Sequence, residues 1–154
     1  MARLDLVEPR ALRGRQDLAD LAAHLRPDTV LVTQMLVQNE LGSVDPVARV
    51  ARMLRARAPN AALHVDAVQA LGKIELSLAA LGADSLALSA HKAHGPKGVG
   101  ALVLAGDRPL VPLVFGGGQE GGRRSGTENV AAIVGFGAAA RLAEDCRDES
   151  EAHC

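Results

Sequence analysis

Aromatic residues are nearly absent from this chain of 154 residues, which contains two phenylalanines and neither tyrosine nor tryptophan. Because proteins bind single-stranded nucleic acid largely by stacking its bases on aromatic side chains, this composition argues against that function. Net charge is also nearly absent, since 17 Lys and Arg residues are balanced by 18 Asp and Glu residues. The chain therefore has no overall field that would attract nucleic acid or an anionic membrane surface.

Long hydrophobic runs are missing as well. The longest apolar stretch, around residues 130–140, includes Gly135 and Gly137 and is shorter than the roughly 20 residues that cross a bilayer. The amino terminus lacks the charged-then-apolar pattern of a signal peptide, and two cysteines near the carboxyl end do not make a disulfide framework. We therefore expect a cytoplasmic protein that binds neither membrane nor nucleic acid.

The remaining composition is that of an ordinary globular domain, with 48% hydrophobic and 23% charged residues. The length is sufficient for one domain with a core of leucine, valine, isoleucine and alanine. Residues 1–16 show no sustained period, so we expect a leader or frayed segment there. Residues 17–146 are expected to form the domain, and residues 147–154 a carboxyl-terminal tail.

Helical and strand patterns alternate along the domain. Runs of β-branched and apolar residues bounded by turn residues predict strands at 29–37, 62–66, 84–89 and 99–105. Helical spacing of apolar residues and end signals predict helices at 17–26, 46–58, 76–81 and 128–144. This order predicts an α/β fold with a mostly parallel sheet and helices on both faces.

The predicted helix at 46–58 has the clearest boundary signals. Asp45 is expected to be its N-cap and Pro46 its first residue, where the missing N–H costs no hydrogen bond. Arg49, Arg52 and Arg55 share one side of this helix. Because the total charge is close to zero, we interpret that side as a solvent-exposed face rather than a nucleic-acid site.

Polar side chains gather where the predicted strands end, which is where open parallel sheets bind ligands. These residues supply a carboxylate, an amine, an imidazole, a hydroxyl and amides: Gln38, Asn39, Asp66, Gln69, Ser89, His91 and Lys92. Taken alone, Asp66 is more typical of a strand cap and Lys92 of a surface lysine. His91 and His94 have no third ligand at a suitable spacing, so no metal is expected.

Two glycine-containing segments allow more than one interpretation. Residues 95–100 lack the Gly-Lys-Ser/Thr ending and the following helix of a P-loop, which favours a tight turn between strands. Residues 116–127 end in Arg-Ser-Gly-Thr at a predicted helix start, an arrangement that suits an anion such as phosphate. A flexible linker explains the composition of the second segment equally well.

Together, these groups suit pyridoxal phosphate. An amine forms a Schiff base with this cofactor, a carboxylate keeps its pyridine nitrogen protonated, and an amide faces its phenolic oxygen. Hydroxyl, imidazole and glycine-loop groups suit its phosphate.

Three motifs occur in the order found in the cysteine desulfurases, which belong to the class V aminotransferase branch of fold type I pyridoxal phosphate enzymes. The chain resembles that family from about Leu18 to Leu142 through His-Val-Asp-Ala-Val-Gln at 64–69, Ser-Ala-His-Lys at 89–92, and the glycine-rich segment with Arg-Ser-Gly-Thr-Glu-Asn at 124–129. The resemblance implies the central part of a pyridoxal phosphate-dependent transferase large domain.

The resemblance also implies roles for individual residues. Lys92 would hold the cofactor and act as acid and base at the substrate, and Asp66 would pair with the pyridine nitrogen. The other implied cofactor contacts are Gln69 and Asn39 at the phenolic oxygen and ring, Ser89 and His91 at the phosphate, and Thr127 at the phosphate across a dimer interface. That last role implies a homodimer.

The implied reaction converts L-cysteine to L-alanine and transfers the sulfur to a thiol acceptor, with a sulfur-acceptor or scaffold protein as partner. In the family, the nucleophilic cysteine and the arginine that binds the substrate carboxylate follow later than any matching position here. Neither Cys146 nor Cys154 occupies the family's loop position. We therefore expect an incomplete chain that is inactive alone. The alternatives are a selenocysteine lyase, a non-catalytic remnant that binds the cofactor, or an unrelated α/β domain.

Overall fold

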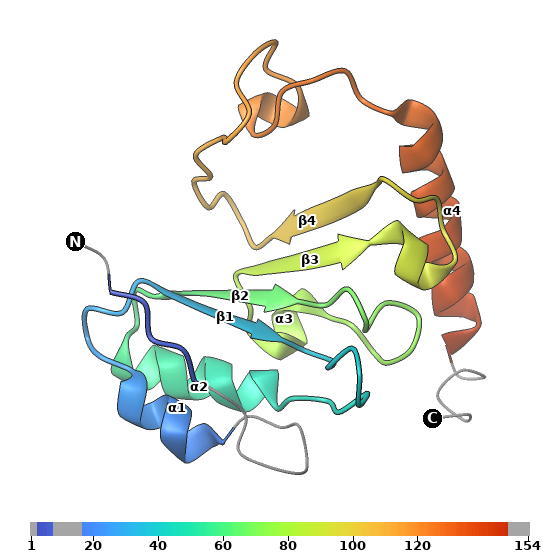
Figure 1. Ribbon diagram of the computed structural model, residues 1–154. Coiled ribbons are helices and arrows are strands. Elements are labelled where there is room, and N and C mark those ends of the chain that lie inside the picture. Colours follow the sequence, from blue (N-terminus) through green and yellow to red (C-terminus); the bar gives the residue numbers. More distant parts are fainter. Residues whose placement is uncertain (1–2, 8–16, 148–154) are drawn as a thin grey trace.

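The sheet of this protein has four strands and is mostly parallel. In the computed structural model, which describes residues 3–7 and 17–147, the strands are β1 (Leu31–Met35), β2 (Ala62–Asp66), β3 (Ser85–Ser89) and β4 (Gly100–Leu104). They lie in sequence order, with β1, β2 and β3 parallel and β4 antiparallel to β3 (Figure 1). The predicted α/β fold with a mostly parallel sheet is confirmed.

The helices predicted from end signals are also present. They are α1 (Leu18–His24), α2 (Val47–Arg57), α3 (Leu78–Leu81) and α4 (Val130–Asp145). The Asp17 carboxylate caps α1 by accepting a hydrogen bond from the Ala19 amide at 2.8 Å, and Gly82 ends α3 in the left-handed conformation. Among the described residues, no helix is long and apolar enough to cross a membrane.

The predicted start of α2 is wrong by one position. The first helical residue is Val47, and Pro46 occupies the N-cap position without a side-chain capping hydrogen bond, so Asp45 is not the cap. The Asp45 amide donates to the Leu36 carbonyl oxygen at 2.8 Å. That bond ties the chain before α2 to the segment that follows β1.

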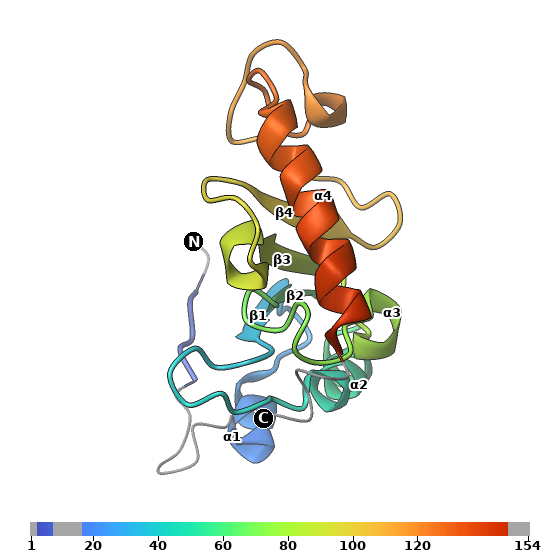
Figure 2. The same ribbon diagram turned by 90° about the vertical axis from the view of Figure 1, so that its right-hand side faces the viewer.

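The core lies between the sheet and the helices α1, α2 and α3. Its largest fully buried side chains are Leu54, Leu63, Val47, Val50 and Val65. On the opposite face of β1, Leu31 and Thr33 are exposed. Helix α4 runs past the edge of the sheet where the parallel strands end and β4 begins (Figures 1 and 2). In the described residues, the helices thus cover one face and this edge, whereas helices were expected on both faces.

A buried carboxylate ties α2 to the sheet at the edge opposite to α4. Asp84 accepts hydrogen bonds from Arg55 at 2.8 Å and from the Leu63 amide at 2.7 Å, and it pairs with Arg108 at 2.6 Å. Burial disfavours the Asp84 anion, but these hydrogen bonds and charges together lower the pKa of Asp84 below its usual value. Arg55 therefore does not belong to the expected solvent-exposed face, whereas Arg49 and Arg52 are exposed.

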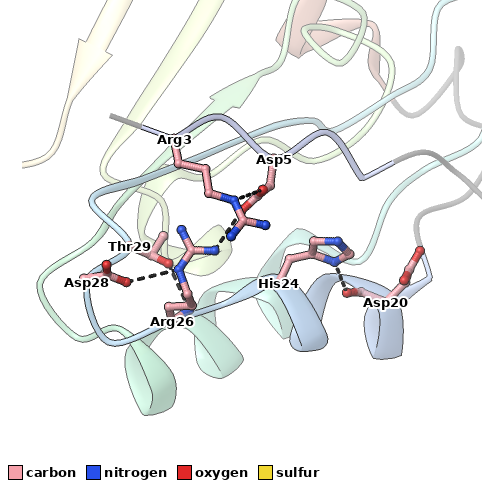
Figure 3. A network of polar contacts seen from close by, with 7 residues as sticks. All are labelled: Arg3, Asp5, Asp20, His24, Arg26, Asp28 and Thr29. Atoms are coloured by element: carbon pink, nitrogen blue, oxygen red, sulfur yellow. Dashed lines mark hydrogen bonds and ion pairs between the residues drawn. The ribbon is translucent and has the colours of Figure 1, made fainter. Parts of the chain in front are cut away.

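Part of the expected leader contacts the domain. Asp5 accepts from Arg3 at 2.7 Å and from Arg26 at 2.8 Å, and Figure 3 shows Arg26 also reaching Asp28. The hydrogen bond from Arg26 lowers the pKa of the Asp5 carboxyl, and Val7 packs against the core. The rest of the expected leader, at 8–16, and most of the expected tail, at 148–154, lie outside the described residues, so the domain boundaries stay predictions.

One polar side chain is buried in the core without compensation. Gln34 in β1 is 7% exposed, and neither its amide oxygen nor its amide nitrogen has a hydrogen-bond partner among the described residues. An unsatisfied buried polar group costs roughly 1–3 kcal/mol of stability.

Replacing Gln34 by an apolar residue of similar length should therefore stabilise the protein. We expect Gln34→Met to raise the free energy of unfolding, measured by urea denaturation, by about 1 kcal/mol. Gln34→Glu keeps the shape but buries a charge, so it should lower that free energy. A Gln34→Met protein that is less stable than the parent would contradict this account of the site.

The Asp84 cluster generates a second prediction. Asp84→Asn removes the negative charge between two arginines and should lower the free energy of unfolding at pH 7 by about 2 kcal/mol. Asp107→Asn is the matched control, because Asp107 is exposed nearby and should change stability little.

The loss caused by Asp84→Asn should depend on pH. Since the pKa of Asp84 is lower in the folded than in the unfolded chain, the ionised carboxylate stabilises the fold at neutral pH. This contribution is fully present above the pKa of the carboxyl in the unfolded chain, about 4. It is lost as the pH falls through the lower pKa of the folded chain. The stability difference between parent and variant should shrink below about pH 4; a constant difference would show that ionisation of Asp84 is not its source.

Candidate active site

Asp66 ends β2 and begins a tightly bonded turn. Its carboxylate accepts a hydrogen bond from the Val68 amide at 3.0 Å, and its carbonyl oxygen accepts one from the Leu36 amide at 2.8 Å. Within the turn, the side-chain oxygen of Gln69 accepts from Lys73 Nζ at 3.1 Å. The segment after β2 is therefore held by its own side chains as well as by its backbone.

The adjacent strand β3 ends in a short helix that carries the predicted lysine. Ser89 ends β3, and its hydroxyl lies 2.8 Å from His91 Nδ1. The 3₁₀ helix η1 (Ala90–Ala93) follows, with Ala90 and Ala93 buried and His91 and Lys92 exposed. Among the described residues, Lys92 Nζ has no hydrogen-bond or ion-pair partner. The buried alanines thus anchor η1 while its amine and imidazole face outward.

The strand register brings these two segments to the same edge. Asp66 pairs with Ala87 across the parallel β2–β3 ladder, just before Ser89. Because both strands run in the same direction, their carboxyl ends emerge together. The sequence prediction that Asp66, Ser89 and the lysine-bearing segment share one edge is confirmed at the level of the backbone.

The chain turns back after η1 through a left-handed residue and two glycines. His94 has a left-handed φ of 59°, and the Gly95 amide donates to the Ala90 carbonyl oxygen at 2.9 Å. A Cβ on Gly100 would lie only 2.6 Å from the Leu88 carbonyl oxygen, so β4 approaches β3 closely there. Residues 95–99 therefore lead through a turn into β4, as predicted.

A groove of about 1130 Å³ lies between this edge and α4. Lys92, Lys73 and His94 contribute its basic groups, and α4 contributes mostly alanine, leucine and the exposed Cys146. Sequence reasoning missed Lys73, although its spacing of four residues from Gln69 is the signal for a contact on a helical turn. The groove is thus apolar in lining, with two amines at its wall.

Of the predicted site residues, only Lys92 lines this groove. Asp66, Gln69, Ser89 and His91 lie in the segments beside it, whereas Asn39 and Thr127 lie on other parts of the chain. Asn39 is exposed in the turn after β1, where the Gln38 side-chain oxygen accepts a hydrogen bond from the Glu40 amide at 2.7 Å. Thr127 is exposed just before α4 begins, whereas the groove is lined by the later part of α4. Figure 1 shows the glycine-rich segment before α4 well away from the carboxyl ends of β2 and β3. Within one chain, Thr127 is not brought to Lys92.

The histidines do not form part of a metal site in the described residues. No three His, Cys, Asp or Glu side chains in that part of the chain are grouped as a metal ion would require. His91 instead contacts Ser89, and His64 Nδ1 lies 2.8 Å from the Ser85 hydroxyl on the neighbouring strand. These contacts account for two of the imidazoles as local hydrogen-bonding groups.

The fold and this edge define a class: an α/β protein with a lysine, a carboxylate, a hydroxyl and an imidazole beyond the carboxyl ends of parallel strands. Residues 2–153 match the model of the family described as aminotransferase class-V. The chain belongs to that family.

Curated relatives agree with this assignment. The chain is 46% identical over 129 residues to Cysteine desulfurase IscS 1 of Archaeoglobus fulgidus, covering 84% of this chain and 33% of the relative. It is 50% identical over 138 residues to Cysteine desulfurase IscS of Anaeromyxobacter dehalogenans, covering 88% and 33% respectively. The chain therefore spans about a third of the length of the curated relatives it matches.

Solved structures share the fold. A NifS-like protein superposes with a TM-score of 0.86 at 44% identity, covering 89% of this chain and 38% of that one. DndA from Streptomyces lividans superposes with a TM-score of 0.82 at 41% identity, covering 94% and 41%. The resemblance noted from three motifs thus extends over most of this chain.

Proposed function

We propose that this chain forms the cofactor-binding centre of a pyridoxal phosphate-dependent cysteine desulfurase, which converts L-cysteine to L-alanine and passes the sulfur to a thiol acceptor. The observation that carries this proposal is the shared edge of Asp66, Ser89 and Lys92, in a chain similar to proteins named cysteine desulfurase. Activity of the whole protein also requires groups that accept sulfur and bind the substrate carboxylate.

The chemistry of the side chains at the edge fits pyridoxal phosphate. A carboxylate, a primary amine, an amide, a hydroxyl and an imidazole match its pyridine nitrogen, aldehyde, phenolic oxygen and phosphate. The Ser89 hydroxyl and His91 ring are already adjacent at 2.8 Å. When bound, this cofactor supplies an electron sink for the negative charge that develops on the substrate carbon.

Each residue has a defined task in this proposal. Lys92 holds the cofactor through its amine and moves a proton at the substrate α-carbon. Asp66, whose carboxylate is oriented by the Val68 amide, accepts the hydrogen bond from the ring nitrogen. Ser89 and His91 bind the phosphate, and Gln69 donates to the phenolic oxygen. Asn39 contacts the ring region from the turn after β1.

A second copy of the chain is proposed to bring Thr127 to the phosphate, because Thr127 lies away from Lys92 within one chain. Exposed large apolar side chains support this arrangement, since side chains of this kind are often covered by a partner. They lie in the segment after β4 and on the first part of α4: Val111, Leu113, Val114, Phe115, Val130, Ile133 and Val134. A cytoplasmic location and a sulfur-acceptor or scaffold protein stay predictions.

The cofactor proposal is tested by adding pyridoxal phosphate to the purified chain and recording visible absorbance. We expect weak binding that depends on Lys92, and borohydride reduction should leave the cofactor on the peptide that contains Lys92, as detected by mass spectrometry. Lys97→Ala is the matched control, because Lys97 is an exposed lysine in the following turn. Lys92→Ala should abolish the adduct and Lys97→Ala should not.

Absence of the adduct at saturating cofactor, or its persistence in Lys92→Ala, would overturn the cofactor assignment. The same chain should release no sulfide from L-cysteine. Sulfide release without any added protein would contradict the expectation that this chain lacks groups essential for sulfur transfer.

The dimer proposal is tested by sedimentation equilibrium. Val134 is one of these apolar residues on α4 and is 66% exposed, so Val134→Glu should weaken self-association at least about tenfold. Ala56→Glu introduces the same charge on α2, away from these residues, and should leave the dissociation constant unchanged. A parent chain that remains monomeric, or a dimer insensitive to Val134→Glu, would contradict the proposal.

A further inference from the structure

The hydrogen bond between Lys73 and Gln69 is not used by the residue roles proposed above. Lys73 Nζ lies 3.1 Å from Gln69 Oε1, and both side chains are half-buried. Lys73 also lines the groove together with Lys92. Because one member of this pair lines the same groove as Lys92, the pair is a candidate for orienting a ligand contact.

The chemistry of the pair fixes which way the Gln69 amide points. A lysine ammonium can only donate hydrogen bonds, whereas a glutamine amide accepts at its oxygen and donates from its nitrogen. The oxygen of Gln69 must therefore face Lys73. Its NH₂ group is left as the end that can donate to a ligand.

The backbone holds Lys73 in place for this role. The Lys73 amide donates to the Ala70 carbonyl oxygen at 3.0 Å, and the Ile74 amide donates to the same oxygen at 3.2 Å. Just before Lys73, Gly72 has φ +72°, and a Cβ there would lie 2.4 Å from Ala143 Cβ on α4. Ile74 packs against the core on the other side. The base of the lysine side chain is thus fixed between α4 and the core.

We infer that Lys73 is a positioning residue that orients the Gln69 amide so that its NH₂ group is presented to a hydrogen-bond acceptor on the ligand. Identifying that acceptor as the phenolic oxygen of pyridoxal phosphate rests on the proposed function. Without Lys73, the Gln69 amide is free to turn over and present its oxygen to that acceptor, where two acceptors repel each other.

The orientation is tested first without any cofactor. In the ¹⁵N-labelled chain, the side-chain NH₂ signals of Gln69 are identified by their loss in Gln69→Ala. We expect Lys73→Met, which removes the donor and keeps most of the length, to shift these signals. Lys73→Arg, which can donate to the same oxygen, should restore positions near those of the parent. Lys97→Met, the same substitution at an exposed lysine, should leave them unchanged.

Unchanged Gln69 signals in Lys73→Met, or an equal shift in Lys97→Met, would overturn the inference. Because this measurement needs no ligand, it decides the role of Lys73 toward Gln69 even if the proposed function fails.

Binding of pyridoxal phosphate then tests the consequence for the ligand. Lys73→Met and Gln69→Ala should each weaken binding about fivefold, the effect of one hydrogen bond. The double variant should bind no more weakly than either single variant, because Lys73 acts through Gln69. Additive losses would show that Lys73 acts independently of Gln69. Failure of the parent chain to bind the cofactor would count against the proposed function.

Discussion

Parallel pairing of β1, β2 and β3 is the constraint on which the rest of the structure depends. Asp66 pairs with Met35 on one side and with Ala87 on the other, so the polar residues after each strand emerge at one edge. Leu63 and Val65 are fully buried in β2, and a shift of one residue would turn them away from the core. Burial of hydrocarbon therefore sets the position of the groups that carry the chemistry.

The two edges of the sheet use carboxylates in different ways. At the amino end of β3, Asp84 is buried between Arg55 and Arg108, and its pKa is lowered. At the carboxyl end of β2, Asp66 accepts one hydrogen bond from a nearby amide and is only half-buried. The first carboxylate is committed to holding α2 and the sheet together, while the second retains capacity to accept from a ligand.

Local patterns were sufficient to predict the strands, the helices and the edge where polar residues meet. They failed where a distant part of the chain decides the outcome. Arg55 was assigned to a solvent-exposed face because nothing near it in sequence reveals Asp84 as its partner. Asp45 was assigned as a cap because it precedes Pro46, but the helix begins at Val47. Gln34 reads as one polar residue in a strand, and only the packed structure shows that both ends of its amide are buried. The roles at the site came from the resemblance carried by three motifs. The register of β2 and β3 brings the motifs at 64–69 and 89–92 to one edge, whereas the third motif lies apart from them.

Helix α4 contacts the loops at this edge through glycines that face small side-chain groups. A Cβ on Gly72 would lie 2.4 Å from Ala143 Cβ, and one on Gly135 would lie 2.7 Å from Pro96 Cγ. The spacing of the two groove walls is therefore set by backbone against methyl and ring carbons. Substitution of alanine for glycine at either position would push the two walls of the groove apart. The width of the groove is in this sense adjustable by mutation without altering Asp66, Ser89 or Lys92.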